Sequence, residues 1–562
     1  MRLSHIEITH FKGIGATQSI DLRPITLLFG PNSAGKSTIL QALHYVREIL
    51  ERHNADPDQT IAGGLIDLGG FATLVHNHDL ALPISIKVKI DLTDEHGSEH
   101  LPINSGVNLG DMEFSELQLR YIVGENTELQ DNAVVQEVAL ALDVRWSDLI
   151  QGPYVAALRV EIDGEPLAAI HSPAQTGRAQ LTDFNFAHPL LSLIVDPNDE
   201  VDPHGSLQSS PLENEVAQLA REVALDRLTT NTPDDKFRVA VDTRIGAIPD
   251  IDRELVVELR DPDVKTVELE NSTPRVRGLR RLLDELVLGP VRIVRDYLNA
   301  MTYIGPLREI PVRSFRPRLS PDESRWAQGL AAWDLLYTDT SGTLLDKVNF
   351  WLGSEERLRT GYRLEKFKFK EVPVPGRLHQ LFERGLSEDD LGELQELYAT
   401  LGGRSEIALL DFEKGIIVAP SDVGVGISQM VPVIVGCVRD YQGILAIEQP
   451  ELHVHPAIQV GLGDLFIEAV QTSEGWVGGG KTLLIETHSE HIILRLLRRI
   501  RETTDSELPP GTVGLSTNDL SVIYVESVDA GVRFRPLRVD GEGEFIDRWP
   551  KGFFEERAEE LF

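Results

Sequence analysis

The run Ile25-Thr-Leu-Leu-Phe29 leads directly into Gly30-Pro-Asn-Ser-Ala-Gly35-Lys36-Ser37-Thr38. The first five residues form an apolar run, which is typical of a strand buried on both faces of a parallel sheet. Residues 37–52 then place apolar side chains at helical spacing. Gly30 to Ser37 fits the pattern G-x4-G-K-[ST], so strand, glycine loop and helix follow in the order that a phosphate-binding loop needs.

The chemistry of such a loop assigns a role to each kind of residue. Glycines let backbone amides curve around phosphate oxygens, and the helix N-terminus adds positive potential. We expect Lys36 to neutralise the β- and γ-phosphate oxygens and Ser37 to bind Mg²⁺. The nucleotide-binding residues expected here are Gly30, Asn32, Ser33, Ala34, Gly35, Lys36, Ser37 and Thr38.

A second segment, Gly475-Trp-Val-Gly-Gly-Gly480-Lys481-Thr482, fits the same pattern in a different context. Here the apolar strand follows the loop, so Lys481 opens a strand and no helix N-terminus points at a phosphate. We interpret this segment as a glycine-rich connection.

An acidic group follows a second apolar run. Ile444-Leu-Ala-Ile447 ends at Glu448, which describes a buried strand that delivers a carboxylate to its C-terminal edge. In phosphate-loop enzymes this acid belongs to the Mg²⁺ shell, and the next residue often polarises the attacking water. That next residue is Gln449, which cannot act as a base near neutral pH. Glu451 is the alternative base.

Two further segments have the pattern of a nucleotide site. Gly424-Val-Gly426-Ile-Ser428-Gln429 opens an apolar helix, and a glycine loop at a helix N-terminus can bind an anion. A simple capped helix has the same pattern. His488 follows the apolar strand 482–485, where a capping or core histidine is the alternative interpretation.

Clustered acids and histidines also allow a metal-site interpretation. Two groups lie close in sequence, namely Glu451, His453 and His455, and Glu486, His488, Glu490 and His491.

Composition narrows the class of protein. The 562 residues are 41% hydrophobic and 25% charged, as in an ordinary globular protein. The single cysteine, Cys437, excludes an intrachain disulfide and fits a reducing compartment. No apolar stretch approaches the ~18–20 residues of a membrane helix, and the first residues lack the apolar region of a signal peptide. We expect a cytoplasmic protein without a membrane partner.

Charge argues against a general binder of polyanions, because the net charge is −35. Residues 275–318 differ from this overall negative charge, because they contain ten arginines and only four carboxylates. They predict a basic patch for DNA, RNA or an acidic protein, or alternatively a helix face paired with surplus carboxylates. The arginines are Arg275, Arg277, Arg280, Arg281, Arg292, Arg295, Arg308, Arg313, Arg316 and Arg318.

The rest of the chain alternates between two patterns. Residues 83–190 contain short β-rich segments with turn signals, which predict an antiparallel meander. Residues 196–235 are polar and predict a loop. Amphipathic helices are predicted at 277–300 and 376–402, and a second α/β pattern begins near residue 405, with strands 444–447 and 482–486 and helices 456–471 and 490–502.

In this order the motifs resemble those of ABC-type ATPases of the RecF, SMC and OLD kind, within the AAA family. Gly424 to Gln429 resembles their signature motif, Glu448 to Pro456 their Walker B and D-loop, and His488 their switch histidine. Tyr303-Ile-Gly-Pro-Leu-Arg308-Glu and Trp549-Pro-Lys-Gly-Phe-Phe554 are similar to a prokaryotic branch often encoded beside anti-phage effectors.

The resemblance implies an α/β head, split by a β-rich lobe and a helical arm. It also implies a homodimer, or a higher even oligomer, in which each signature segment closes the partner's ATP site. The implied domains are 1–82, the first half of the head; 83–270, the lobe and acidic loop; 271–402, the arm or lid; 403–525, the second half of the head; and 526–562, the tail.

Departures from the family pattern change the expected activity. The usual Walker B aspartate is Glu448 and the usual catalytic glutamate is Gln449, so we expect slow ATP hydrolysis. The arm lacks the long heptad run of a DNA-entrapping rod. Val522 to Asp529 is at most a remnant of the acidic Toprim motif of OLD nucleases, so any nuclease is expected in a separate effector.

These features predict an ATP- and Mg²⁺-dependent dimeric switch that regulates an effector in antiviral defence. Glu448, Gln449, Glu451 and His488 are the expected catalytic residues, and Ser37 and Glu448 the Mg²⁺ ligands. The alternatives are a metal-dependent nuclease, using Glu448, Glu451, His453 and His455, and a DNA-repair clamp.

Overall fold

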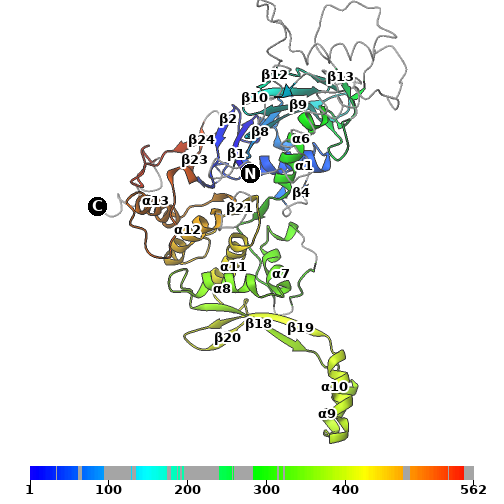
Figure 1. The fold of residues 1–562 in the computed structure, drawn as a ribbon, viewed down its shortest axis with the longest axis vertical. Helices are drawn as coiled ribbons and strands as arrows, with labels where there is room; N and C mark the ends of the chain where they lie inside the picture. The colour runs from blue at the N-terminus through cyan, green and yellow to red at the C-terminus, as the bar shows by residue number, and fades with distance from the viewer. Residues whose placement is uncertain are drawn as a thin grey trace, which may run out of the picture.

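Two β-sheets and the helices that cover them form the body of the protein, in a computed structural model (Figure 1). The described residues are 1–93, except 33, 58 and 61–65; strands 128–129 and 193–194; 135–189, except 174–178 and 186–187; 239–258, except 256; 283–471, except 313–314 and 320–322; and 481–549, except 529–530.

The six-stranded sheet joins the two ends of the chain. Its strand order is β17-β21-β22-β3-β23-β24, and all neighbours are parallel except β23 and β24. β3 therefore lies between two strands that come more than four hundred residues later. The strands are β3 Ile25–Phe29, β17 Thr302–Ile304, β21 Ile444–Glu448, β22 Thr482–Glu486, β23 Leu520–Val528 and β24 Gly531–Leu537.

The nine-stranded sheet is antiparallel and has the order β16-β13-β11-β10-β9-β8-β6-β1-β2. The predicted meander is therefore present, and the first two strands of the chain extend it. The strands are β1 Arg2–Thr9, β2 Gln18–Asp21, β6 Ile84–Asp91, β8 Glu137–Ser147, β9 Gly152–Ile162, β10 Glu165–His171, β11 Gln180–Thr182, β13 Val239–Val241 and β16 Val257–Glu258.

Helices cover both faces of the six-stranded sheet. Alternate residues of β3 belong to two apolar cores: Leu28 packs with α1 and the nine-stranded sheet, whereas Leu27 packs with α7, α11, α12 and α13. Alternation of this kind is what buries a central parallel strand on both faces. The helices are α1 Thr38–Arg52, α6 Gly289–Asn299, α7 Leu330–Thr338, α8 Thr343–Gly353, α11 Val425–Val438, α12 Pro456–Val470 and α13 Glu490–Thr504.

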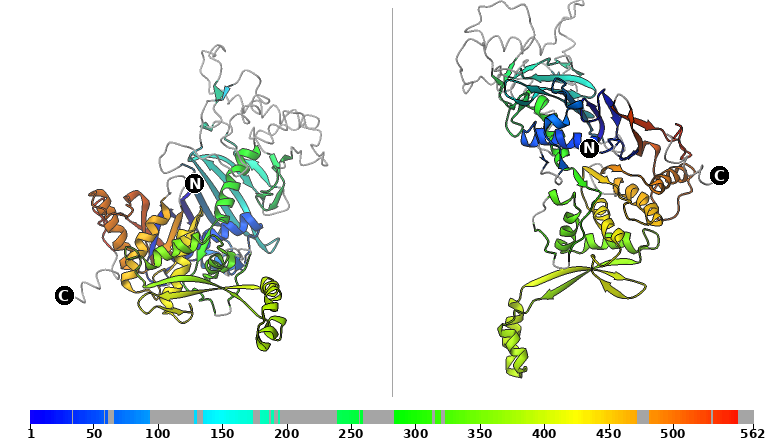
Figure 2. Two further views of the ribbon diagram at one scale, coloured as in Figure 1. Left: turned by 60° about the horizontal axis from the view of Figure 1, so that its bottom comes forward. Right: turned by 180° about the vertical axis from the view of Figure 1, so that it is seen from behind.

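A narrow projection leaves the body below α8 and stands clear of both sheets in Figure 1 and in the view from behind in Figure 2. Its shaft is the antiparallel pair β18, Tyr362–Lys370, and β19, Gly403–Asp411, and its tip is formed by α9, Arg377–Arg384, and α10, Leu391–Thr400. β20, Ile416–Val418, pairs with β19 at the base. The helices predicted within 376–402 thus lie at the end of a β-ribbon.

Local sequence patterns predicted the main elements well. Strands 25–29, 444–447 and 482–486 and helices 37–52, 456–471 and 490–502 are confirmed within one or two residues at each end. The loop predicted at 196–235 falls outside the described residues. No helix in the described ranges is long and apolar enough to cross a bilayer.

Candidate nucleotide-binding site

The glycine loop connects β3 to α1 at the C-terminal edge of the six-stranded sheet. Gly30 has φ +148°, and a Cβ there would lie 2.2 Å from the carbonyl oxygen of Val525. Only glycine fits this position. The Lys36 ammonium curls back over the loop and donates to the carbonyls of Gly30, at 3.1 Å, and Pro31, at 2.9 Å. Ser33 lies outside the described residues.

Two carboxylates face this loop from neighbouring strands. Glu448 and Glu486 end β21 and β22 and are partners in the register of the two strands. The Ser37 hydroxyl donates to Glu486 at 2.8 Å, and the Lys36 ammonium lies 3.6 Å from the same carboxylate. Glu486 therefore belongs to the phosphate-loop site. In the sequence it was only part of the alternative metal cluster, although it too ends an apolar strand.

Burial and charge perturb the ionisation of these groups. Burial, with the neighbouring Glu486 carboxylate, raises the pKa of Glu448 to about 7. Burial lowers the pKa of Lys36, and the charge of Glu486 opposes that shift. Two acids this close repel each other, and a cation between them would relieve the repulsion. Hydroxyl and carboxylate oxygens are the donors that Mg²⁺ prefers, so Ser37, Glu448 and Glu486 fit the expected ion.

The turn after β21 holds Gln449 and the candidate base Glu451 in different ways. Gln449 adopts φ +45°, and its backbone N–H donates to the backbone carbonyl of Glu486 at 2.7 Å. The Glu451 carboxylate accepts 2.7 Å bonds from the Thr487 hydroxyl and the His488 amide. Glu451 therefore ties this turn to the segment that follows β22.

His488 faces the loop lysine. Its amide is held by Glu451, while its buried Nε2 has no hydrogen-bond partner among the described residues. Burial, together with the charge of Lys36, lowers the pKa of this imidazole. A neutral ring with an unused nitrogen can contact a phosphate oxygen.

Arg308 is a buried member of the site that sequence reasoning placed in a surface patch. It follows β17, and its Nη2 donates to the carbonyl of Glu448 at 2.7 Å and to that of Gln449 at 3.2 Å. Its Nε and Nη1 have no partner among the described residues, and burial lowers its pKa to about 10. Gln429 donates to the Arg308 carbonyl at 3.1 Å, which links this arginine to α11.

The signature-like segment lies at the start of α11. Gly424 is its exposed N-cap, with nothing within 4 Å of a Cβ built there. A Cβ on Gly426 would lie 2.3 Å from the carbonyl oxygen of His453, so this glycine permits close contact with the turn after β21. Ser428 is fully buried and donates to Pro420 within its own chain at 2.6 Å.

The second glycine-lysine match lies at the opposite end of β22. Lys481 is buried, and its ammonium donates to the carbonyl of Cys437. Burial lowers the pKa of Lys481 to about 8, and Cys437 is itself buried. This environment is structural, because the strand β22, and not a helix, follows Lys481 directly.

The alternative metal cluster gains no support from the geometry. Within the described ranges, no group of three or more histidine, cysteine or acidic side chains is placed to hold a metal ion. His455 instead caps α12, accepting a bond from the amide of Ala457 at 3.2 Å.

The arginines of residues 275–318 do not form one free basic surface among the residues described. Arg292 donates to Asp284 at 2.8 Å, Arg295 donates to Asp252 at 2.6 Å, and Arg308 is buried. For Arg292 and Arg295 the alternative interpretation is correct, because both side chains pair with carboxylates. The members outside the described residues are Arg275, Arg277, Arg280, Arg281 and Arg313.

A family model described as an AAA ATPase domain matches residues 1–134 and 369–493. No curated protein matches the chain. Among solved structures, the chain is similar to an Smc head bound to the C-winged helix domain of ScpA, at 10% identity over 96% of this chain and 98% of that one, with a TM-score of 0.38.

Two other solved structures have similar scores. One is the SMC head domain from Thermotoga maritima, at 9% identity over 96% of this chain and 100% of that one, with a TM-score of 0.35. The other is an Smc head domain with an extended coiled coil bound to the C-terminal domain of ScpA derived from Pyrococcus furiosus. It is 11% identical over 100% of this chain and 98% of that one, with a TM-score of 0.34. The family match in two segments, with an insertion between them, confirms the predicted mixed α/β fold split by an insertion.

Proposed function

We propose that the chain binds ATP with Mg²⁺, hydrolyses it slowly, and uses the bound nucleotide to hold two copies together. The observation that carries this proposal is the meeting of Lys36 and Ser37 with Glu448 and Glu486 at one edge of the sheet. Residues from both halves of a split domain are brought together where a phosphate loop opens.

Each residue has a defined task in this proposal. The loop amides and Lys36 bind the phosphates, and Lys36 exchanges its bonds to the Gly30 and Pro31 carbonyls for phosphate oxygens. Ser37, Glu448 and Glu486 hold Mg²⁺, which neutralises charge that develops on the phosphates when it is bound. His488 contacts the γ-phosphate through its unused Nε2.

Slow turnover follows from the residues beside the water position. Gln449 can orient a water molecule but cannot take its proton. The Glu451 carboxylate, which could, is already bound to Thr487 and His488. A general base typically contributes ~10²–10⁴-fold, so we expect turnover well below the ~10 s⁻¹ median of enzymes.

The dimer is proposed from the exposed start of α11. Gly424 is exposed at a helix N-terminus, with nothing within 4 Å of a Cβ built there, and lies far in sequence from the phosphate loop. A phosphate on a second copy can cap such a terminus. Ser428 could join this contact only if its bond to Pro420 were exchanged.

The proposed biological role is regulation of a separate effector, such as a nuclease, in prokaryotic antiviral defence. The resemblance of the Tyr303–Glu309 and Trp549–Phe554 segments supports this role. The alternative of a DNA-repair clamp predicts tight, salt-sensitive DNA binding by the chain alone.

The decisive experiment compares the two lysines of the glycine loops. Lys36→Ala should abolish ATP binding in calorimetry, because the lysine is the loop's phosphate ligand. Lys481→Ala should leave binding nearly intact, since its ammonium donates to the Cys437 carbonyl at the far end of β22 from the phosphate loop. Equal loss in both variants would contradict the proposed site.

A further inference from the structure

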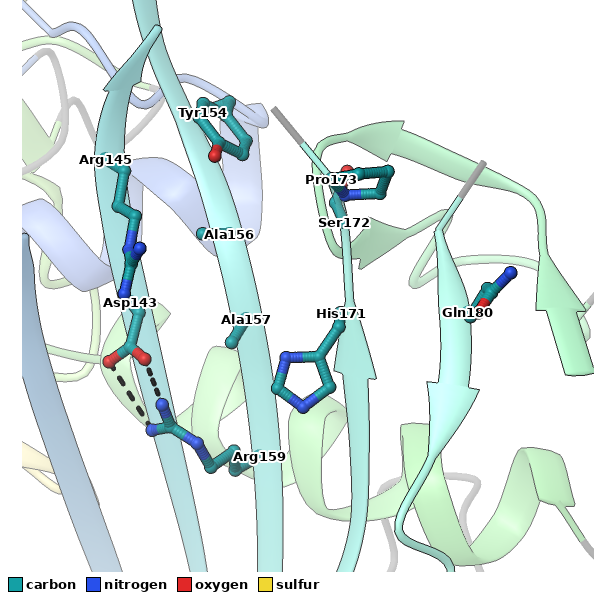
Figure 3. A pocket seen from close by; sticks show the side chains of 10 residues that line it. All are labelled: Asp143, Arg145, Tyr154, Ala156, Ala157, Arg159, His171, Ser172, Pro173 and Gln180. Carbon is teal, nitrogen blue, oxygen red and sulfur yellow. Dashed lines mark hydrogen bonds and ion pairs between the residues drawn. The ribbon is translucent and has the colours of Figure 1, made fainter. Parts of the chain in front are cut away.

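A hollow of about 740 Å³ opens on the face of the nine-stranded sheet that is turned away from α6 (Figure 3). Core residues such as Leu158 and Val160 pack with α6 on the other face of the sheet. The hollow is lined from four adjacent strands, β8 to β11, and its size lies within the range of small-molecule sites.

Strand register explains why the sheet is hollow here. Ala157 pairs with Asp143 on one side and with His171 on the other, and His171 pairs with Gln180. A small residue therefore lies in the centre of a row whose other members are long. A register shift after Asp143 leaves Ala156 without a partner on β8, so Ala156 and Ala157 both line the floor. Bulges of this kind re-aim side chains beside functional sites.

Hydrogen-bond donors outnumber acceptors around this floor. The one carboxylate in the lining, Asp143, is already engaged by the Ser85 hydroxyl at 2.7 Å and by the Arg159 guanidinium. Arg145 lines the same wall and forms no ion pair with any residue of the described ranges, in a chain of net charge −35. Tyr154, almost fully buried, stands opposite Arg145 in the strand register.

We propose that this hollow binds a nucleotide unit, with its phosphate on Arg145 and its base over the alanine floor beside Tyr154. An arginine without a counter-ion recognises phosphate, and a flat apolar floor beside an aromatic ring accepts a base of any sequence. Gln180 adds a further donor on the far wall, whereas His171 lies 3.6 Å from the Asp183 carboxylate and is partly engaged. The unit can come from a free nucleotide or from a nucleic-acid strand.

The test measures fluorescence anisotropy of a labelled oligothymidylate with the full chain carrying Lys36→Ala, so that the phosphate loop does not contribute. Arg145→Glu in this background should weaken binding about tenfold or more and lower the salt dependence by about one phosphate contact. Lys368→Glu, on the exposed shaft of the projection, changes the net charge equally and should leave binding unchanged. Ala157→Leu, which fills the floor, should weaken binding without a change of charge.

Competition with thymidine monophosphate identifies the source of the unit. Displacement of the oligonucleotide indicates a free-nucleotide site, and absence of displacement indicates a strand. The proposal is overturned if the oligonucleotide and the monophosphate both fail to bind, or if Arg145→Glu and Lys368→Glu bind equally. The part of ATP binding that Lys36→Ala removes should be the same with and without Arg145→Glu, which separates this test from that of the phosphate loop.

Discussion

The Ser37 hydroxyl donates a 2.8 Å hydrogen bond to the carboxylate of Glu486, a residue 449 positions further along the chain. This bond joins the loop after β3, in the first segment that the family model matches, to the end of β22, in the second. Glu486 also lies 3.6 Å from the Lys36 ammonium, so one carboxylate contacts both key residues of the phosphate loop.

Removing that carboxylate should impair metal-dependent hydrolysis. We expect Glu486→Gln to raise the Mg²⁺ concentration needed for half-maximal ATP turnover by about tenfold, because one of the two carboxylate ligands loses its charge. Titration of activity with MgCl₂ measures this shift. Glu490→Gln, at the start of α13, is the matched control, and an equal shift there would contradict the role of Glu486.

The raised pKa of Glu448 makes stability depend on pH in a defined direction. The folded protein holds the proton up to about pH 7, whereas the unfolded chain loses it near pH 4.5. The folded state therefore binds more protons in this window, and the free energy of unfolding should fall as pH rises from about 5 to about 7.5. Thermal unfolding without nucleotide or Mg²⁺ measures the slope. Glu448→Gln should flatten it, and an unchanged slope would show that another group is responsible.

Restoring a base beside the water position should accelerate hydrolysis. Gln449→Glu should raise kcat by about 10²–10⁴-fold and shorten the lifetime of an ATP-bound dimer. Glu451→Gln keeps one acceptor for Thr487 or His488 and should have a small effect on kcat. If Gln449→Glu leaves steady-state phosphate release unchanged while Glu451→Gln abolishes it, the base is Glu451.

Arg308 should act as a positioning residue for the turn that carries Gln449. Arg308→Ala leaves the carbonyls of Glu448 and Gln449 without their buried donor, which should lower the free energy of unfolding by about 1–3 kcal/mol. kcat should fall more than KM rises, because the turn orients water and metal. Arg308→Lys retains the charge and one donor and should restore part of kcat. A purely structural role predicts instead that kcat follows the folded fraction in both variants.

The proposed dimer contact is best tested at Gly424. A side chain there meets open space and φ is negative, so Gly424→Asp should fold normally and repel a phosphate of the second copy. Light scattering with ATP and Mg²⁺ should show a dimer for the natural chain and a monomer for the variant. Gly426→Asp is a poorer choice, since its Cβ collides with the His453 carbonyl. Equal masses for Gly424→Asp and the natural chain would exclude this contact.

Sequence patterns predicted the elements that depend on neighbouring residues. The β3–loop–α1 unit and the apolar strand ending at Glu448 could be predicted, because hydrophobic periodicity and glycine spacing depend on residues that are close together in the sequence. Glu486 has the same local signal as Glu448, but its meeting with Ser37 depends on strand order. Strand order is set by packing between segments that are hundreds of residues apart, and the local patterns of a single sequence do not predict it.

The arginines illustrate the same limit. Arg292 and Arg308 look alike in a charge-rich stretch of sequence, yet one is paired with Asp284 and the other is buried against the turn after β21. Their environments come from distant segments, so counting charges could not separate them. The hollow beside Arg145 was missed for a related reason: it arises where a small residue meets long neighbours across strands.

The place of β3 between β22 and β23 sets the order in which this protein can be built. During synthesis residues 25–29 leave the ribosome long before β22 and β23, their two neighbours in the sheet, have been made. Until then this apolar strand has two unpaired edges. Contacts of such separation fold slowly and expose the chain to misassembly. Truncation before residue 481 would therefore remove more than the last strands: it would leave the phosphate loop without the sheet that supports it.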